Sequence, residues 1–294
     1  MVFTDDWQTS QRIFQYLGNE DLVALSTVSR SLQERAEHTL YYNINLQELI
    51  DGKRIESWCL AILCESRRAH RVNILKFPVR LKYAPASNTS LSIPMLHGTI
   101  KRTFRAMINL KELFVFGSAR LKDEADTINS ILPSTFNNCE FRLSGLAGEL
   151  PEFPPEDVWK LLAKHPDITY WVPGSPLLLS IPSFPLSILP NLREVVLVRP
   201  ELTFCLEGRP IQSLMLAFVQ HVHTRDDGLE AITALKLFKE TLQTLVYQYP
   251  PNTLDWSLED IVRAIAQSAP NLRTLTLSCF LVKVSLVGVR TTQI

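Results

Sequence analysis

The sequence predicts an α/β protein in two parts, a three-helix module at the N-terminus and an α/β solenoid after it. Three observations predict this class: short apolar strand patterns recur along the chain, amphipathic helical stretches lie between many of them, and similar turns precede them. Strands that alternate with helices require parallel pairing through crossovers. We therefore expect a curved parallel sheet with helices on its convex side over residues 46–294, and the helical module over residues 1–45.

The N-terminal module is predicted from three short helical stretches with almost no linker between them. Gly18 is expected to end the first helix, Asn19 or Asp21 to cap the second, and the capping box at residues 31–34 to open the third. Helices this short are marginal on their own, so they must pack on each other, on the next domain or on a partner. Their apolar positions are Ile13, Phe14 and Leu17 in the first stretch, Leu22, Leu25 and Val28 in the second, and Leu32, Ala36 and Leu40 in the third.

The strands of the solenoid are predicted from copies of an apolar-x-x-apolar-x-apolar pattern. These copies begin at Ala69, Leu110, Phe136, Ile168, Leu192, Ile211, Leu242 and Leu272. Two of the turns before them, at residues 190–193 and 270–273, share the sequence Pro-Asn-Leu-Arg. The copies average about 28 residues, within the range of leucine-rich repeats, which this array resembles in a degenerate form. Helices are expected at Ile55–Glu65, His97–Ile108, Pro155–His165 and Leu229–Lys239, and after a capping Ser257.

A family resemblance lies in the N-terminal residues. The sequence Ile-Phe-x-Tyr-Leu at residues 13–17 is followed by Asp-Leu at 21–22, Leu-Ser-x-Val-Ser-Arg-x-Leu at 25–32 and Leu-Tyr at 40–41. In order and spacing this resembles an F-box. The resemblance implies that the module docks on the Skp adaptor of a Skp–cullin–F-box ubiquitin ligase, and that the solenoid presents a protein substrate for ubiquitylation. The implied adaptor-binding residues are Ile13, Phe14, Leu17, Leu22, Leu25, Val28 and Leu32.

One part of the family pattern is missing. Family members usually open with Leu-Pro followed by an acid and further leucines, and here residues 5–10 read Asp-Asp-Trp-Gln-Thr-Ser. Because that opening contributes to adaptor binding in the family, a second function stays open. In this alternative the chain is a ligase-independent repeat scaffold, and its N-terminal helices only cap the solenoid.

Side-chain alternation along each strand predicts where the substrate binds. The last two apolar residues of each pattern point into the core, so the residue between them and the one after point to the concave face. An exposed apolar row there is typical of a partner surface. Two alternatives stay open: loops such as Pro173–Pro190 cover this face, or the register is shifted by one residue and the row is core. The predicted substrate-binding residues are Phe114, Phe116, Val196, Val198, Met215 and Val246.

Composition argues against other classes of function. Lys plus Arg (30) equals Asp plus Glu (30), so we expect neither a nucleic-acid nor a membrane partner. Five scattered cysteines without a C-x-x-C pair and the absence of a signal-peptide pattern indicate a cytoplasmic or nuclear protein. We expect no cofactor, no metal and no catalytic residue. His221-Val222-His223 has metal-like spacing, but no second group completes that site.

The C-terminal residues leave another choice open. After the strand pattern at Leu272, residues 280–286 continue as an apolar stretch and the sequence stops at Ile294. Solenoids normally need a polar capping repeat at their ends. Either this tail folds back as the cap, or the chain is a fragment of a longer array.

Overall fold

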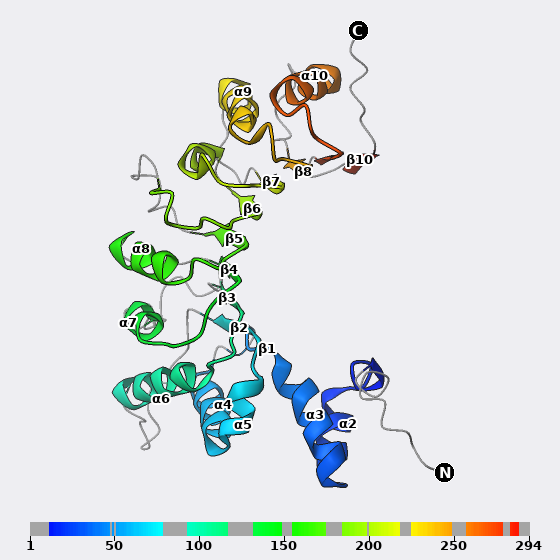
Figure 1. The fold of residues 1–294 in the computed structure, drawn as a ribbon. Coiled ribbons are helices and arrows are strands. Elements are labelled where there is room, and N and C mark those ends of the chain that lie inside the picture. Colours follow the sequence, from blue (N-terminus) through cyan, green and yellow to red (C-terminus); the bar gives the residue numbers. More distant parts are fainter. Residues whose placement is uncertain are drawn as a thin grey trace. The chain divides into compact units, whose positions relative to one another are not determined.

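The computed structural model describes residues 12–47, 49, 51–78, 93–116, 132–148, 155–174, 184–198, 200–217, 225–248, 257–278 and 283–287. The chain forms two compact units, Met1–Leu143 and Ser144–Ile294. Helices and strands alternate along the chain in both units, which confirms the predicted α/β class (Figure 1).

The first unit holds the N-terminal helices and three parallel strands. Residues 12–14 are helical. They are followed by α2 (Asn19–Ser26), α3 (Arg30–Tyr42), β1 (Asn43–Asn45), α4 (Gly52–Cys64), α5 (Ser66–Arg71), β2 (Ile74–Pro78), α6 (Ile93–Ala106), β3 (Glu112–Phe116) and α7 (Leu132–Asn137). β1 pairs in parallel with β2, and β2 with β3. In the core, the Phe104 ring of α6 meets Phe77 of β2 and Phe136 of α7 edge to face, with centroids 5.3 and 5.2 Å away.

The second unit continues the alternation of strand and helix. Its elements are β4 (Gly145–Gly148), α8 (Pro155–Lys164), β5 (Tyr170–Pro173), β6 (Glu194–Leu197), η3 (Pro200–Leu206), β7 (Ser213–Ala217), α9 (Arg225–Ala234), η4 (Leu235–Phe238), β8 (Thr244–Gln248), α10 (Leu258–Ser268), β9 (Thr274–Ser278) and β10 (Lys283–Val287). From β4 to β9 each strand pairs in parallel with the next. This confirms the predicted parallel pairing. β10 pairs with β9 in the antiparallel direction, so the apolar tail folds back.

The core of the second unit lies between its strands and helices α8, α9 and α10, which lie on one side of the strands (Figure 1). On β6, β7, β8 and β9, alternate side chains face these helices and are 2% exposed or less: Val195 and Leu197, Leu214 and Leu216, Leu245 and Tyr247, Leu275 and Leu277. Ile261 and Ile265 of α10 are buried from the opposite side. The buried side chains, which alternate along the strands, and the apolar face of the helix therefore form one packing layer.

The same hydrogen-bond pattern holds the entry to successive strands of the second unit. Two consecutive backbone N–H groups donate to one carbonyl oxygen of the preceding repeat at distances of 2.8–3.0 Å. We call this pattern the backbone clasp. It joins Arg193 and Glu194 to Thr169, Gln212 and Ser213 to Arg193, Gln243 and Thr244 to Gln212, and Arg273 and Thr274 to Gln243. In the first unit Lys111 and Glu112 donate to Asn73 in the same way.

The asparagine of the repeated Pro-Asn-Leu-Arg turns makes a hydrogen bond that explains why this sequence recurs. The Asn191 side chain donates to the carbonyl oxygen of Pro166 at 3.2 Å, and the Asn271 side chain to that of Lys239 at 3.1 Å. Both acceptors belong to the preceding turn. Asn109 donates to His70 at 2.7 Å in the first unit. The asparagine therefore links adjacent turns.

Two predicted strands are wrong in position. Ala69 lies in α5, and the strand begins at Ile74 with Leu75 and Phe77 as its buried residues. The pattern fits the sequence equally well three residues later, where the apolar side chains are larger. Phe136 lies in α7, and its ring packs on Phe104.

The strand predicted to begin at Phe136 corresponds to β4 in the structure. β4 begins at Gly145 and follows the buried Leu143. Gly148, with φ 132°, stands where the other repeats have their last apolar residue. A strand pattern based on apolar residues therefore misses it.

Two other local predictions also differ from the structure. The Ser29 hydroxyl, not the box at residues 31–34, caps α3 by accepting from the Leu32 N–H at 3.3 Å. α2 begins directly after Gly18, and neither Asn19 nor Asp21 caps it because both lie inside its first turn. Ser257 caps α10 as predicted, since its hydroxyl accepts from the Asp260 N–H at 3.1 Å. The first strand, β1, was not predicted, and the domain boundary at residue 45 stays a prediction.

Candidate interaction surfaces

The N-terminal helices have a core of their own. Phe14, Leu22 and Ala36 are buried together, one from each helical stretch. Leu17, Leu25, Leu32 and Leu40 pack around them and are partly buried. Five of the seven residues predicted to bind an adaptor therefore also hold the three helices together: Phe14, Leu17, Leu22, Leu25 and Leu32.

The other two predicted docking residues point to solvent. Ile13 is 58% exposed and Val28 is 67% exposed. Two neighbours outside the predicted docking set are also exposed, Tyr16 at 91% and Val23 at 55%. Tyr16 lies three residues after Ile13, so helical spacing could have placed it on the same face. We call Ile13, Tyr16, Val23 and Val28 the N-terminal apolar residues.

A buried carboxylate joins α3 to α5. Glu37 is 3% exposed, and its oxygens lie 3.2 Å from Nε of Arg67, 3.3 Å from Nη2 of Arg68 and 3.5 Å from Nη1 of Arg71. Glu65 also pairs with Arg67 and with Arg68. Because α5 leads into β2, this ionic cluster holds the third N-terminal helix against the first repeat.

Two aromatic side chains of α3 lie beside the same arginines. The Arg68 guanidinium lies 5.6 Å from the centre of the Tyr41 ring, and burial raises the pKa of the Tyr41 hydroxyl. Burial, and then the charge of Arg71, lower the pKa of the His38 imidazole. Burial and the charge of Arg71 thus both disfavour a charged imidazole at His38.

In the second unit the predicted substrate-binding residues lie on the face that points away from the helices. Met215 is directly beside Val196 on one neighbouring strand and Val246 on the other, and Thr276 follows on β9. All four are partly exposed, whereas the residues before and after Met215, Val246 and Thr276 on each strand are buried. For these residues the alternative of a strand register shifted by one residue, which would place the row in the core, is therefore wrong. Val198 is also partly exposed, directly after β6.

The remaining predicted residues of this row belong to the first unit. Phe114 of β3 is partly exposed, and Nζ of Lys76 on β2 lies 5.7 Å from its ring centre. Phe116 is the last residue of β3, and its side chain lies outside the described residues. Much of Pro173–Pro190, proposed as a cover for this face, also lies outside them.

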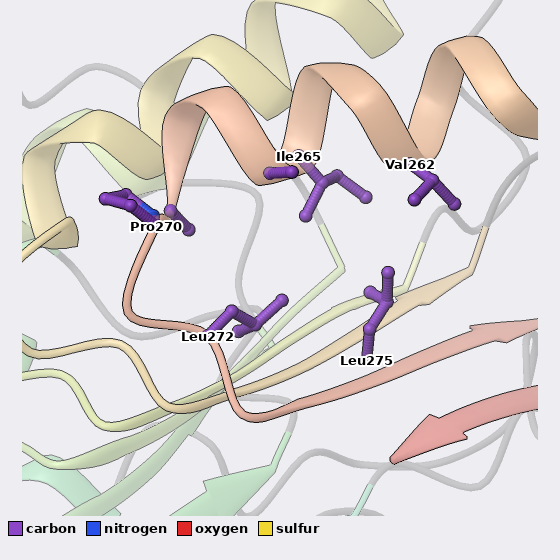
Figure 2. Close-up of a pocket in the computed structure, with 7 residues that line it drawn as sticks. Val262, Ile265, Pro270, Leu272 and Leu275 are labelled. Atoms are coloured by element: carbon purple, nitrogen blue, oxygen red, sulfur yellow. The ribbon is translucent and has the colours of Figure 1, made fainter. Parts of the chain in front are cut away.

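A small pocket between α10 and β9 has an apolar lining. Val262, Ile265, Ala266, Ala269, Pro270, Leu272 and Leu275 form its walls, and Figure 2 shows the α10 side chains above Leu272 and Leu275. Because no polar side chain lines it, this pocket offers a ligand apolar contact without side-chain hydrogen bonds. It lies within the packing layer of the last repeat.

Metal sites, membrane spans and reactive thiols each require particular side chains. Within them no cluster of three His, Cys, Asp or Glu side chains could hold a metal ion, and His221-Val222-His223 lies outside them. No helix in the described ranges is long and apolar enough to cross a membrane. Burial raises the pKa of the Cys59 thiol to about 12, so this thiol is protonated at neutral pH.

The leucine-rich repeat-containing protein LegL7 from Legionella pneumophila is similar to this chain with a TM-score of 0.47 and 14% sequence identity. The match covers 87% of this chain and 81% of LegL7. No protein-family model matches the chain, and neither does any curated protein.

Proposed function

We propose that this chain is a non-catalytic adaptor, the substrate-recognition subunit of a Skp–cullin–F-box ubiquitin ligase in the cytoplasm or nucleus. The proposal rests on the solvent exposure of the N-terminal apolar residues. Ile13, Tyr16, Val23 and Val28 stay exposed although the same short helices bury Phe14, Leu22 and Ala36 in a core. Exposed apolar residues gathered in so short a segment are typical of a surface that a partner covers.

The two parts of the chain have different partners in this proposal. The N-terminal apolar residues contact the Skp-type adaptor, and the row of Val196, Met215 and Val246 contacts the substrate protein. The row suits this function because the parallel register aligns three apolar side chains on the face opposite the helices. No cofactor takes part, since recognition by an adaptor requires only contact.

Co-expression with a Skp-type adaptor tests the proposal. We expect the full chain to co-purify with the adaptor, and the double variant Ile13→Asp with Val28→Asp to bind it roughly tenfold more weakly or worse. Both side chains are exposed, so the melting temperature of the free chain should not change. Leu258→Asp is the matched control, because Leu258 is an exposed apolar residue at the first position of α10, where Asp is compatible with a helix start.

A second function is favoured by the ionic cluster around Glu37. Because Glu37 joins α3 to α5, the N-terminal helices also have a structural role against the first repeat. A ligase-independent scaffold with an N-terminal cap would need only this contact. A folded chain that separates cleanly from the adaptor in the co-purification would overturn the ligase proposal and support the scaffold.

A further inference from the structure

Basic residues are concentrated in one part of this chain, although its net charge is zero. Residues 53–111 contain 12 of the 30 Lys and Arg residues and two of the 30 Asp and Glu residues. Of these two acids, Glu56 is buried, and Glu65 pairs with Arg67 and Arg68. The sequence on either side has the opposite balance, with 8 acidic and 3 basic residues at 1–52 and 5 acidic and 3 basic residues at 112–143. The neutral total therefore conceals a local surplus of positive charge.

Part of this surplus is exposed on helix α6, which packs beside α4 and α5 (Figure 1). The sequence of α6 includes Lys101, Arg102 and Arg105 but neither Asp nor Glu. Arg102 and Arg105 are exposed and Lys101 is partly exposed, and no carboxylate in the described part of the chain forms an ion pair with any of the three. Like charges three or four residues apart on a helix repel each other. The fold of α6 therefore gains nothing from this arrangement.

Two more residues on the same face of α6 suit close contact with another molecule. Met95, Gly98, Arg102 and Arg105 follow one another at helical spacing and therefore share one face, which we call the outer face of α6. Met95 is 60% exposed. Gly98 is exposed, and a Cβ atom at this position would have no atom within 4 Å. Glycine destabilises a helix interior relative to alanine, and no close neighbour requires it here. It leaves a gap between Met95 and Arg102 that admits a partner's backbone.

The composition of this face favours an acidic protein segment over a nucleic acid. Met95 offers apolar contact, which a phosphate backbone cannot use. The aromatic ring of α6, Phe104, is buried and therefore offers no platform on which a base could stack. The basic stretch is also bounded by acidic ones, so a long polyanion would meet repulsion beyond it. A short segment that combines carboxylates with an apolar residue matches every one of these features.

We infer that the outer face of α6 binds an acidic segment of a partner protein. Asp or Glu side chains of the segment pair with Arg102 and Arg105, because the planar guanidinium fork matches a carboxylate. The backbone of the segment passes close to Gly98, and an apolar side chain packs on Met95. This interaction goes beyond the proposed function, since it involves neither the N-terminal apolar residues nor the strands.

A labelled synthetic peptide with a leucine followed by several glutamates tests the inference on the full-length protein. Fluorescence anisotropy should detect binding, and the same peptide with glutamine in place of every glutamate should bind roughly tenfold more weakly or worse. A rise from about 0.1 M to about 1 M NaCl shortens the Debye length from about 10 Å to about 3 Å, so it should also weaken binding. A short DNA duplex of the same net charge should bind more weakly than the glutamate peptide.

The double variant Arg102→Gln with Arg105→Gln should bind the glutamate peptide roughly tenfold more weakly or worse. Lys160→Gln with Arg263→Gln is the matched control, because it removes two exposed positive charges from other helices and should leave binding unchanged. Gly98→Leu fills the gap with a good helix former. It should keep or raise the melting temperature while it weakens binding by roughly threefold or more, so a misfolded helix cannot explain the loss.

The inference is overturned if the glutamate peptide does not bind, if the glutamine peptide binds equally well, or if either α6 variant binds like the unaltered chain. Tighter binding of the DNA duplex would also overturn it and assign the surface to nucleic acid. Ile13→Asp with Val28→Asp should bind the glutamate peptide normally, and the α6 variants should still co-purify with the Skp-type adaptor. The ligase proposal and this inference can therefore fail separately.

Discussion

The two units each contain a buried charged side chain, and the two charges are stabilised in different ways. In the first unit Glu37 is surrounded by the opposite charges of Arg67, Arg68 and Arg71. In the second unit Arg209 is 4% exposed, and the described contacts of its guanidinium are backbone carbonyl oxygens and one aromatic ring. Glu37 joins α3, which precedes the repeats, to α5, and Arg209 joins the proline-rich segment before β6 to the residues after η3.

Among the described residues, the contacts of Arg209 show how backbone carbonyl groups can surround a buried cation where no carboxylate pairs with it. Its guanidinium donates to the carbonyl oxygens of Ile188 and Pro185 at 2.9 Å and to that of Phe184 at 3.3 Å, which lie in the proline-rich segment. It also donates to the backbone carbonyl oxygen of Cys205 in η3 at 3.3 Å and to that of Glu207 at 2.9 Å. Burial lowers the pKa of this guanidinium. Five carbonyl dipoles thus replace water around one charge.

Removal of Glu37 and removal of Arg209 should therefore lower the free energy of unfolding by different amounts. The arginines around Glu37 are partly exposed, so water can solvate them when Glu37 is removed. The carbonyl groups around Arg209 are mostly enclosed and would lose their donors together. We therefore expect the larger destabilisation in the second unit.

Arg209→Leu should lower the free energy of unfolding by about 3–5 kcal/mol, because several buried carbonyl groups lose their hydrogen bonds. Arg209→Lys should recover only part of this loss, since an ammonium group lacks the planar fork of donors. Urea denaturation followed by circular dichroism measures both values. Arg193→Leu, at an exposed position before β6, is the control. A loss below about 1 kcal/mol for Arg209→Leu would contradict this account of the buried cation.

Glu37→Gln should lower the free energy of unfolding by about 2–3 kcal/mol, less than Arg209→Leu, because three arginines lose one shared partner but still reach solvent. The same denaturation experiment measures it. Glu34→Gln is the matched control on the same helix, since Glu34 is exposed and its ion pair with Arg71 is long at 3.9 Å. Equal effects of the two substitutions would show that burial of Glu37 has no energetic importance.

Asn271→Ala should have the smallest effect, about 0.5–1 kcal/mol, because it removes one hydrogen bond between adjacent turns near the surface. Gln267→Ala on the exposed side of α10 is the control. The melting temperature should fall for the first variant and stay constant for the second. If Asn271→Ala matched Arg209→Leu, the turns and not the buried charge would be the main support of the second unit.

Local periodicity explains what could be predicted from sequence. The strands after the Pro-Asn-Leu-Arg turns were correctly placed because the turn and the apolar spacing agree at both positions. The strand at Gly145 could not be found by the same rule, since glycine occupies its last apolar position. The pattern at Phe136 fitted a strand, but Phe136 lies in α7, where its ring packs on Phe104 of α6.

The candidate surfaces could be predicted only in part. The register of Val196, Met215 and Val246 follows from alternation along each strand, so sequence was sufficient. Which of the N-terminal residues are buried and which are exposed depends on how the three helices pack together. The spacing of apolar residues within one helix does not determine that packing. Glu37 and Arg209 were also missed. The arginine partners of Glu37 are 30 to 34 residues away in the sequence, and the partners of Arg209 are backbone carbonyl groups.

The backbone clasp at the strand entries has a consequence for how such a chain can change. It uses only main-chain atoms, so it places no demand on the side chains of Thr169, Arg193, Gln212 or Gln243. Helical connections of unequal length can therefore start and finish at the same kind of junction. Insertions and deletions between strands can accumulate over generations without loss of alignment from one strand to the next. Sequence similarity can thus fade while the architecture persists.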